Sequence, residues 1–101
     1  MWMFVMFDLP TNTTKDRKEY AKFRKELEKD GFVMYQYSIY TRFCASLESA
    51  NVHIKRVKGI IPIKGKISIL LITDKQYSNI INIWGAIEKK SHPQPMQLEF
   101  F

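Results

Sequence analysis

The first apolar run of the chain covers residues 1–7 and ends at Asp8 and Pro10. A short run without polar interruption is typical of a strand buried on both faces, so we expect it to be the central strand of a sheet. After a polar loop, residues 15–31 read KDRKEYAKFRKELEKDG and carry apolar side chains at the spacing of one helix face. This pattern predicts the first helix, capped by Thr13 or Thr14, closed by Gly31 and packed through Tyr20, Phe23 and Leu27.

Residues 32–43 are rich in aromatic and β-branched side chains, which favour an extended backbone. The segment can form a tight hairpin near Gln36 to Ser38 or one bent strand, and the sequence leaves both alternatives open. The next stretch, from residue 45 to about residue 58, predicts a second helix that ends at Gly59 and Pro62. Its imperfect apolar stripe consists of Leu47, Ala50, Val52, Ile54 and Val57.

The remainder of the chain predicts further strands. KISILLIT, residues 66–73, is expected to be a strand; residues 74–79 can form a short helical turn, and IINIW, residues 80–84, predicts another strand. This order is that of a ferredoxin-like α+β fold, βαββαβ, with additional C-terminal strands. We therefore expect a ferredoxin-like domain over residues 1–87, followed by a linker and an extended C-terminal tail over residues 88–101.

The predicted sheet has more apolar surface than two helices can cover. The two faces of its first strand carry Trp2, Phe4 and Met6 on one side and Met3, Val5 and Phe7 on the other. Because both helices of this fold lie on one face, the second face needs another cover. We expect a homodimer in which the two sheets face each other and the C-terminal strands of one protomer cap its partner. The alternative is that the chain's own tail folds back over the sheet.

Size, charge and cysteine content narrow the class of protein. With 101 residues, 46% of them hydrophobic, the chain can form one domain and has no room for a separate catalytic domain. Its 16 Lys and Arg against 10 Asp and Glu give a net charge of +6, which favours a polyanion as partner. Cys44 is the single cysteine, so no disulfide forms within the chain. The N-terminal run is far shorter than the ~20 residues of a membrane span, and we expect a cytoplasmic protein without a membrane partner.

Asp8 is the main candidate for chemistry, because it stands at the carboxyl end of the first strand, ahead of a polar loop. A carboxylate there can ligate Mg²⁺, which prefers oxygen donors, but one carboxylate makes a poor site. A two-fold axis would bring two copies of Asp8 to one shared ion, which could activate water for phosphodiester cleavage. The alternative is that Asp8 only accepts hydrogen bonds from backbone N–H groups of the turn.

Other catalytic signals are few. His53 and His92 have no second His or Cys at ligand spacing, so we expect both at the surface and no zinc site. Cys44 is expected to be a small apolar filler. The tyrosines of the extended segment could stack on single-stranded RNA, but the RNP1 pattern of RNA-recognition motifs is not visible, and packing in the core or a dimer interface is favoured. These tyrosines are Tyr35, Tyr37 and Tyr40.

Basic side chains gather on the two predicted helices. Acidic residues lie among them, so part of the cluster is a charge-paired, solvated face. In a dimer each cluster appears twice, which suits the two phosphate rows of double-stranded DNA. The expected phosphate contacts are Arg17, Lys18, Arg24, Lys25, Arg56 and Lys58.

Four segments together resemble one known family: MWMFVMFDLP, DRKEYAKFRKELEKDGF, MYQYSIYTRF and KISILLITDKQY. They are similar to the small adaptation protein of CRISPR systems, Cas-two, in the form found beside RNA-guided type II interference nucleases. The resemblance covers about residues 1–87 and does not include the tail.

The resemblance implies a ferredoxin-like homodimer that acts in spacer acquisition. It implies that the dimer bridges copies of the Cas-one integrase and holds captured double-stranded DNA while Cas-one joins its ends to the CRISPR array. Some members are Mg²⁺-dependent ribonucleases or deoxyribonucleases whose metal ligand is the aspartate after the first strand, here Asp8. A Gln-x-Ser feature of the family falls on Gln36 and Ser38.

This chain departs from the family pattern at Phe7, where many members have a tyrosine before the aspartate. The phenolic hydroxyl beside the metal is therefore missing. This weighs against the endonuclease activity and leaves the scaffold function unaffected.

Overall fold

The structure is a computed structural model that describes residues 1–85 and 87–90. Its elements follow the order predicted for a ferredoxin-like α+β fold, with a further short helix and a hairpin at the end. They are β1 (Trp2–Asp8), α1 (Thr14–Lys29), β2 (Val33–Gln36), β3 (Ile39–Phe43), α2 (Leu47–Lys58), β4 (Lys66–Ile72), α3 (Asp74–Ser78), β5 (Ile81–Trp84) and β6 (Ile87–Lys90).

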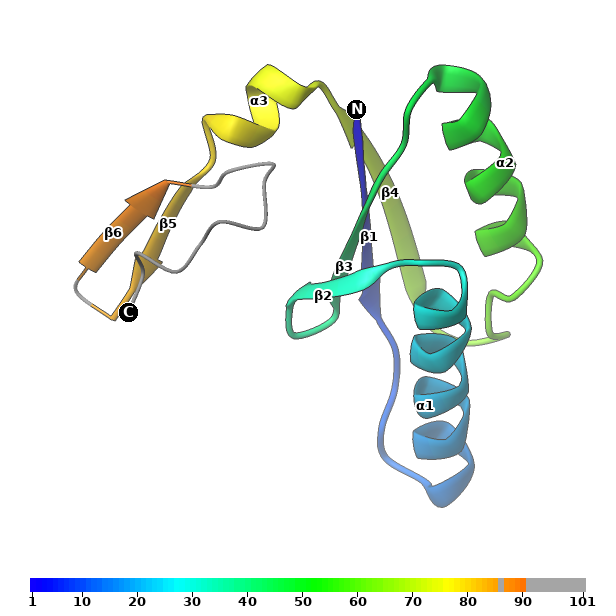
Figure 1. The fold of residues 1–101 in the computed structure, drawn as a ribbon. Helices are drawn as coiled ribbons and strands as arrows, with labels where there is room; N and C mark the ends of the chain where they lie inside the picture. The colour runs from blue at the N-terminus through cyan, green and yellow to red at the C-terminus, as the bar shows by residue number, and fades with distance from the viewer. Residues whose placement is uncertain (86, 91–101) are drawn as a thin grey trace.

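The main sheet has the strand order β2-β3-β1-β4, and its neighbouring strands are antiparallel. The apolar β1 is therefore an inner strand, as its sequence predicts. Helices α1 and α2 lie to one side of this sheet, whereas α3 and the β5–β6 hairpin lie to the other (Figure 1). None of the helices among residues 1–85 and 87–90 is long and apolar enough to cross a membrane.

Helix α1 is fixed at both ends by local chemistry. Thr13 is the cap, and it forms a capping box in which its hydroxyl accepts from the Asp16 N–H while the Asp16 carboxylate accepts from the Thr13 N–H. At the other end Gly31 adopts a φ of 88°, and the Phe32 N–H donates to the Leu27 carbonyl. This Schellman-type ending reverses the chain into β2. The predicted helix and its closing glycine are confirmed.

Helix α2 begins later than predicted, because Ser46 caps it and Leu47 is its first residue. Its buried residues are Ala50, His53 and Val57. Two members of the predicted apolar stripe, Leu47 and Val52, are instead exposed. The predicted stripe is wrong at these positions because the buried face follows Ala50, His53 and Val57; Val52 lies on the other side of the helix and Leu47 is its first residue.

The segment 32–43 forms a tight hairpin, so the alternative of one bent strand is wrong. Strands β2 and β3 are joined by the two residues Tyr37 and Ser38. Ser38 has a φ of 63°, the left-handed conformation that a two-residue hairpin turn often needs. The register shifts between Met34 and Gln36, which marks a β-bulge just before the turn.

The core lies between the helices and one face of the sheet. Met3, Val5 and Phe7 from β1 pack there with Phe23 and Leu27 from α1. The opposite face carries Trp2 and Phe4, and among the described residues the Trp2 ring stacks on Tyr77 of α3 with centroids 4.0 Å apart. Exposed apolar side chains of the main sheet include Val33, Phe43 and Leu70.

The C-terminal part of the described chain touches the sheet through β5, because the Tyr35 hydroxyl donates to Asn82 Oδ1 at 2.7 Å. The sequence predicts that the domain ends at residue 87 and the tail begins at residue 88, and strand β6 includes residues on both sides of this boundary. Residues 91–101 of the predicted tail lie outside the described residues.

Candidate nucleic-acid interface

Asp8 is the last residue of β1 and lies opposite Lys66 of β4 in the strand register. Its side chain is exposed, and within residues 1–85 and 87–90 its carboxylate forms no hydrogen bond or ion pair. The alternative in which Asp8 caps the turn is therefore not what the structure contains. The carboxylate opens into a hollow of about 450 Å³, which we call the Asp8 hollow, lined by Met6, Phe7, Asp8, Tyr37, Ser38, Ile39, Lys66 and Ser68.

Within residues 1–85 and 87–90, the donors around Asp8 are fewer than a magnesium site usually has. Among the described residues no group of three or more His, Cys, Asp or Glu side chains could hold a metal ion. The polar side chains that the hollow adds to Asp8 are two serine hydroxyls, the Tyr37 hydroxyl and the cationic Lys66, whereas Mg²⁺ sites usually rest on one or two carboxylates with substrate phosphates. Asp8 is the only carboxylate among the described residues that line the hollow.

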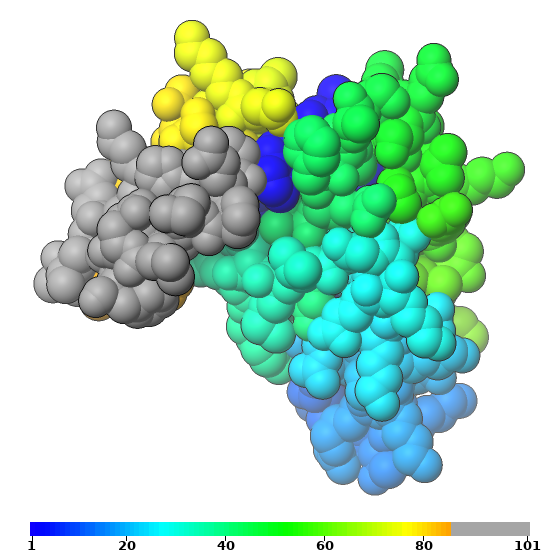
Figure 2. All heavy atoms as spheres, in the orientation of Figure 1, coloured from blue at the N-terminus to red at the C-terminus, as the bar shows by residue number. Residues whose placement is uncertain are grey.

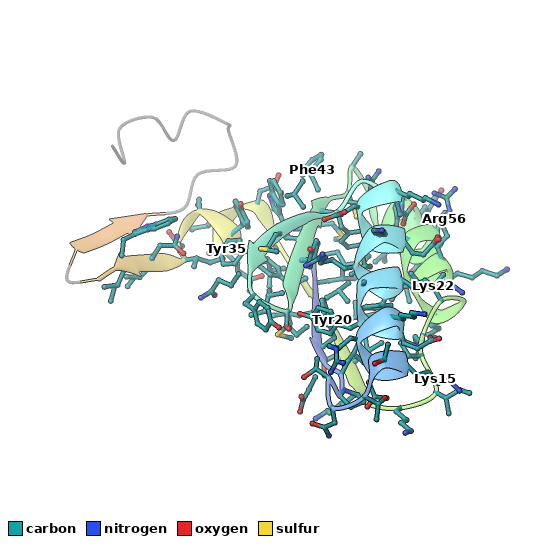
Figure 3. The ribbon with its side chains drawn as sticks, turned by 90° about the horizontal axis from the view of Figure 1, so that it is seen from below. Lys15, Tyr20, Lys22, Tyr35, Phe43 and Arg56 are labelled. Carbon is teal, nitrogen blue, oxygen red and sulfur yellow. The ribbon has the colours of Figure 1, made fainter. Side chains whose placement is uncertain are left out.

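The lysines of α1 form one exposed row, and we call it the lysine ridge. Its positions are separated by three or four residues, the spacing that places side chains on one side of a helix. The ridge consists of Lys15, Lys18, Lys22, Lys25 and Lys29, all of them exposed. Lys15 and Lys22 lie on the opposite side of α1 from Tyr20, which faces the sheet (Figure 3).

The ridge is accessible from solvent over the whole length of α1. In Figure 2 the side chains of α1, blue to cyan, form the lower part of the face turned to the viewer, next to those of α2 in green. Of the five lysines only Lys29 has an ion pair within the described residues, a 3.6 Å contact with Glu26. Four ammonium groups therefore remain available for an anionic partner.

The six predicted phosphate contacts do not form one surface. Lys18 and Lys25 belong to the lysine ridge, but Arg17 and Arg24 lie about a third of a turn away around α1. The Arg17 guanidinium donates to the Thr11 and Asn12 carbonyls at 3.1 and 3.3 Å, so it also holds the loop before the helix. The regular lysine spacing in the sequence is the signal for the ridge, and the predicted contacts omit its other three members, Lys15, Lys22 and Lys29.

On α2, Lys58 is exposed and Arg56 is engaged. Arg56 Nη1 donates to Asp30 Oδ1 at 2.7 Å, and His53 Nδ1 lies 2.7 Å from the other oxygen, Oδ2. His53 is buried, so its predicted place at the surface is wrong: the carboxylate at the end of α1 gives the ring a partner inside the fold. Burial acts to raise the pKa of Asp30, but the hydrogen bonds from His53 and Arg56 together outweigh it and hold that pKa below its ordinary value.

The remaining candidates have different environments. Cys44 is buried, as predicted for an apolar filler, and burial raises the pKa of its thiol. Tyr40 is fully buried and Tyr35 half-buried, in agreement with a packing role. Tyr37 is exposed at the hairpin turn, so it is not a core residue, and a place in a dimer interface stays a prediction.

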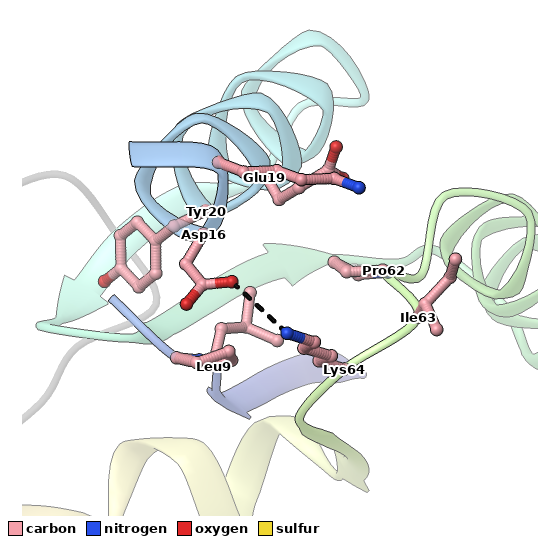
Figure 4. A pocket seen from close by; sticks show the side chains of 9 residues that line it. Leu9, Asp16, Glu19, Tyr20, Pro62, Ile63 and Lys64 are labelled. Atoms are coloured by element: carbon pink, nitrogen blue, oxygen red, sulfur yellow. Dashed lines mark ion pairs between the residues drawn. The ribbon is translucent and has the colours of Figure 1, made fainter. Parts of the chain in front are cut away.

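A second cavity, of about 240 Å³, lies between the start of α1 and the loop before β4 (Figure 4). Its main charged contact is the ion pair between Asp16 and Lys64, 3.9 Å apart. Asp16 is also part of the capping box. Asp16 therefore serves the end of the helix, and this cavity shares no lining residue with the Asp8 hollow.

Comparison with known proteins places the chain in a family. The family model described as CRISPR associated protein Cas2 matches residues 1–80. The chain belongs to the Cas2 family. This is the Cas-two family that the sequence resembles, so the chain is a component of CRISPR systems.

Individual Cas2 relatives match over most of the chain. A protein of Parvibaculum lavamentivorans named CRISPR-associated endoribonuclease Cas2 is 48% identical over 101 residues, covering all of both chains. A protein of the same name from Flavobacterium psychrophilum is 48% identical, and the match covers 100% of this chain and 88% of the relative. Another, from Streptococcus mutans, is 41% identical, and the match covers 84% of this chain and 78% of the relative. The first two matches include residues 88–101, which lie beyond the resemblance seen in the sequence.

Proposed function

We propose that this Cas2 chain is a homodimeric scaffold that binds double-stranded DNA during spacer acquisition and bridges copies of the Cas-one integrase. The observation that carries the proposal is the lysine ridge. Lysines on a helix face that points away from the core contribute little to packing. Ammonium groups along one row can neutralise successive phosphates and release their counterions, which gives affinity without base recognition.

The homodimer is proposed from the partly covered face of the main sheet. Val33, Phe43 and Leu70 there are 60%, 48% and 47% exposed. Apolar side chains gathered on one sheet face favour association, and a two-fold interface would bury the same patch on both protomers. It would also present two lysine ridges, matching the two phosphate rows of a duplex.

The DNA proposal is tested by fluorescence anisotropy with a labelled blunt duplex at several salt concentrations. Lys25→Glu on the ridge should weaken binding and reduce the slope of log K against log salt by about one for each phosphate that the protein no longer neutralises. Lys75→Glu on α3 changes the net charge equally and is the matched control, because Lys75 is exposed and lies on another element. Equal effects of the two variants would show that net charge alone, and not the ridge, governs binding.

The homodimer is tested by sedimentation velocity at micromolar concentration. Wild type should sediment as a dimer, and Leu70→Glu should sediment as a monomer because it places a charge on the apolar face. Ile63→Glu is the control, since Ile63 is exposed in the loop before β4. A folded wild-type monomer at this concentration would refute the scaffold.

The role in spacer acquisition is tested by co-purification with Cas-one and by integration of a labelled duplex into a CRISPR array. Lys18→Glu combined with Lys25→Glu should reduce integration while leaving co-purification with Cas-one intact. Integration at the wild-type rate by this variant would contradict a scaffold that acts through the ridge.

A second candidate function is an Mg²⁺-dependent endonuclease with paired copies of Asp8. Two observations favour it: the relatives are named endoribonucleases, and the Asp8 carboxylate is exposed and unpaired within the described residues. Purified wild type and Asp8→Ala are incubated with labelled RNA and duplex DNA, with Mg²⁺ or EDTA. Cleavage that needs Mg²⁺ and is abolished in Asp8→Ala supports the enzyme; cleavage that persists in the variant points to a contaminant. Integration that survives Asp8→Ala favours the scaffold.

A further inference from the structure

The loop between α2 and β4 exposes aliphatic side chains to solvent. It covers residues 59–65, GIIPIKG, and we call it the isoleucine loop. Ile61 is 46% exposed and Ile63 is fully exposed, although surface loops usually carry polar side chains. Exposed aliphatic side chains that gather on one surface mark contacts with other molecules.

Both ends of the isoleucine loop are fixed by the fold. At its start, the Ile60 N–H donates to the Val57 carbonyl at 3.0 Å. At its end, Gly65 has a φ of 97°, and a Cβ there would lie 2.7 Å from the Asp8 carbonyl oxygen. Pro62 restricts the backbone between these ends. The loop is therefore largely ordered before a partner arrives, which lowers the entropy cost of binding.

Two hollows lie between the isoleucine loop and α1. Figure 4 shows the first, the cavity of about 240 Å³, which Ile63 lines. The second has a volume of about 370 Å³ and is lined by Ile61. Pro62 and Glu19 line both, so the two hollows are neighbours along the helix. Concave hollows with apolar walls accept inserted side chains, and a lipid surface has no such projections.

The charges around the two hollows favour an acidic partner. Their ammonium groups belong to Lys15, Lys22 and Lys64, and their carboxylates to Asp16, Glu19 and Glu26. Two of these carboxylates are already engaged, because Asp16 accepts from the Thr13 N–H in the capping box and Glu26 lies 3.6 Å from Lys29. The hollows therefore present more positive than negative charge to solvent, which complements a partner that carries carboxylates.

The position of the isoleucine loop favours a helical partner segment. The loop belongs to no strand, so it offers no row of backbone groups to which an extended peptide could add a strand. A helix satisfies its own backbone hydrogen bonds and presents apolar side chains at positions i and i+4, about 5–6 Å apart. Such a pair can enter two neighbouring hollows.

We propose that the isoleucine loop and α1 form a docking site for an acidic amphipathic helix of another protein. Two apolar side chains of that helix enter the hollows beside Pro62 and cover Ile61 and Ile63, and its carboxylates lie beside the three lysines. This interaction goes beyond the proposed function, which concerns DNA, Cas-one and a second copy of the chain. Lys18 and Lys25, which the DNA experiments replace, are not among the described residues that line these hollows.

The experiment measures binding of labelled helical peptides of about 18 residues to the full chain by fluorescence anisotropy. The first peptide carries two leucines four positions apart, glutamates beside them and alanines elsewhere. A second peptide of the same composition places the leucines on opposite sides of the helix, and a third has lysines in place of the glutamates. The chain should bind the first peptide at least about fivefold more tightly than either of the others.

Variants of the chain locate the binding. Ile61→Ser and Ile63→Ser should each weaken it at least about fivefold, because each removes an aliphatic contact from the centre of the interface. Lys64→Glu should weaken binding and reduce its salt dependence. Val52→Ser is the matched control, since Val52 is 48% exposed on α2 and does not belong to the described lining of either hollow. Duplex affinity of the isoleucine variants should change less than about twofold, because phosphate contacts come from polar and charged groups.

The contrary outcomes are distinct. Equal binding of the three peptides, or no binding of the first, refutes an acidic amphipathic helix as the occupant. Equal effects of Ile63→Ser and Val52→Ser refute the isoleucine loop as its site. If Ile63→Glu dissociates the homodimer, the loop contacts a second copy instead, and if only vesicles of anionic phospholipid bind, it contacts a membrane. Wild type that binds the first peptide but no duplex refutes the proposed function and leaves the docking site standing.

Discussion

Asp30 is the residue whose replacement should reveal how the two helices are joined. Its carboxylate accepts hydrogen bonds from His53 and Arg56 of α2, both at 2.7 Å, and its carbonyl accepts one from Arg42 of β3 at 2.8 Å. An ionised carboxylate only accepts, so His53 Nδ1 carries the shared hydrogen. Asp30→Ala removes both side-chain acceptors and keeps the backbone contact with Arg42.

The expected loss follows from the burial of each partner. His53 is buried, and a buried donor without a partner costs about 1–3 kcal/mol. The Arg56 side chain is 61% exposed, so that arm contributes only about 0–1 kcal/mol. Asp30→Ala should therefore lower the free energy of unfolding by the sum of the two contributions, about 1–4 kcal/mol. For a domain of this size, each kcal/mol lowers the Tm by about 4–8 °C.

The assay is urea unfolding and thermal melting at one protein concentration, because association also changes apparent stability. Arg56→Ala is the matched control and should lose no more than about 1 kcal/mol. Asp30→Asn keeps an acceptor for His53, so its loss of unfolding free energy should lie between those of the other two variants. The reasoning is refuted if Asp30→Ala lowers the free energy of unfolding by no more than Arg56→Ala does.

The same carboxylate predicts a pH dependence. Its pKa is lower in the folded protein than its ordinary value, so ionised Asp30 stabilises the fold at neutral pH. This contribution disappears as the pH falls below about 4 and the carboxylate is protonated. The difference in stability between wild type and Asp30→Asn should therefore shrink below about pH 4. A difference that stays constant from about pH 7 to about pH 3 would contradict the role of the charge.

Three further outcomes are expected. Cys44 is buried and burial raises its pKa, so a thiol reagent should label it slowly in buffer and completely in urea; rapid labelling of native protein would contradict this burial. Gly65→Ala should lower the free energy of unfolding by about 1–3 kcal/mol, because Gly65 has a φ of 97° and a Cβ there would lie 2.7 Å from the Asp8 carbonyl oxygen. Urea unfolding at wild-type stability would show that the loop adapts. Leu27→Ala, at a fully buried core position, should lower the free energy of urea unfolding by about 2–5 kcal/mol. A loss of stability below about 1 kcal/mol would show that this side chain is not part of the core.

Much of the fold could be predicted because local patterns carry it. The apolar run before Asp8 specified an inner strand, the Tyr20, Phe23 and Leu27 spacing specified the buried face of α1, and Gly31 marked the end of that helix. Each of these signals depends on residues within a few positions of one another. The same local reasoning failed on α2, where it predicts a buried Val52 and an exposed His53.

That failure has a tertiary cause, since a histidine becomes a core residue only when another element supplies its partner. The partner is Asp30, which is 23 positions away in the chain and comes within hydrogen-bond distance only when α1 and α2 pack side by side. The hairpin at Tyr37 was likewise left open by the sequence, because a bent strand has the same residue preferences as two short ones.

The candidate site divides in the same way. The α+β order, the place of Asp8 at the end of its strand, the lysine spacing of α1 and the family resemblance are all readable in the amino-acid sequence, because they follow from the order of residues along the chain. The folded structure was needed to show that Arg17 and Arg56 are partly engaged in the fold, and that Asp8, Tyr37 and Lys66 line one hollow. Those relations depend on strand register and helix packing, which join residues far apart in the sequence.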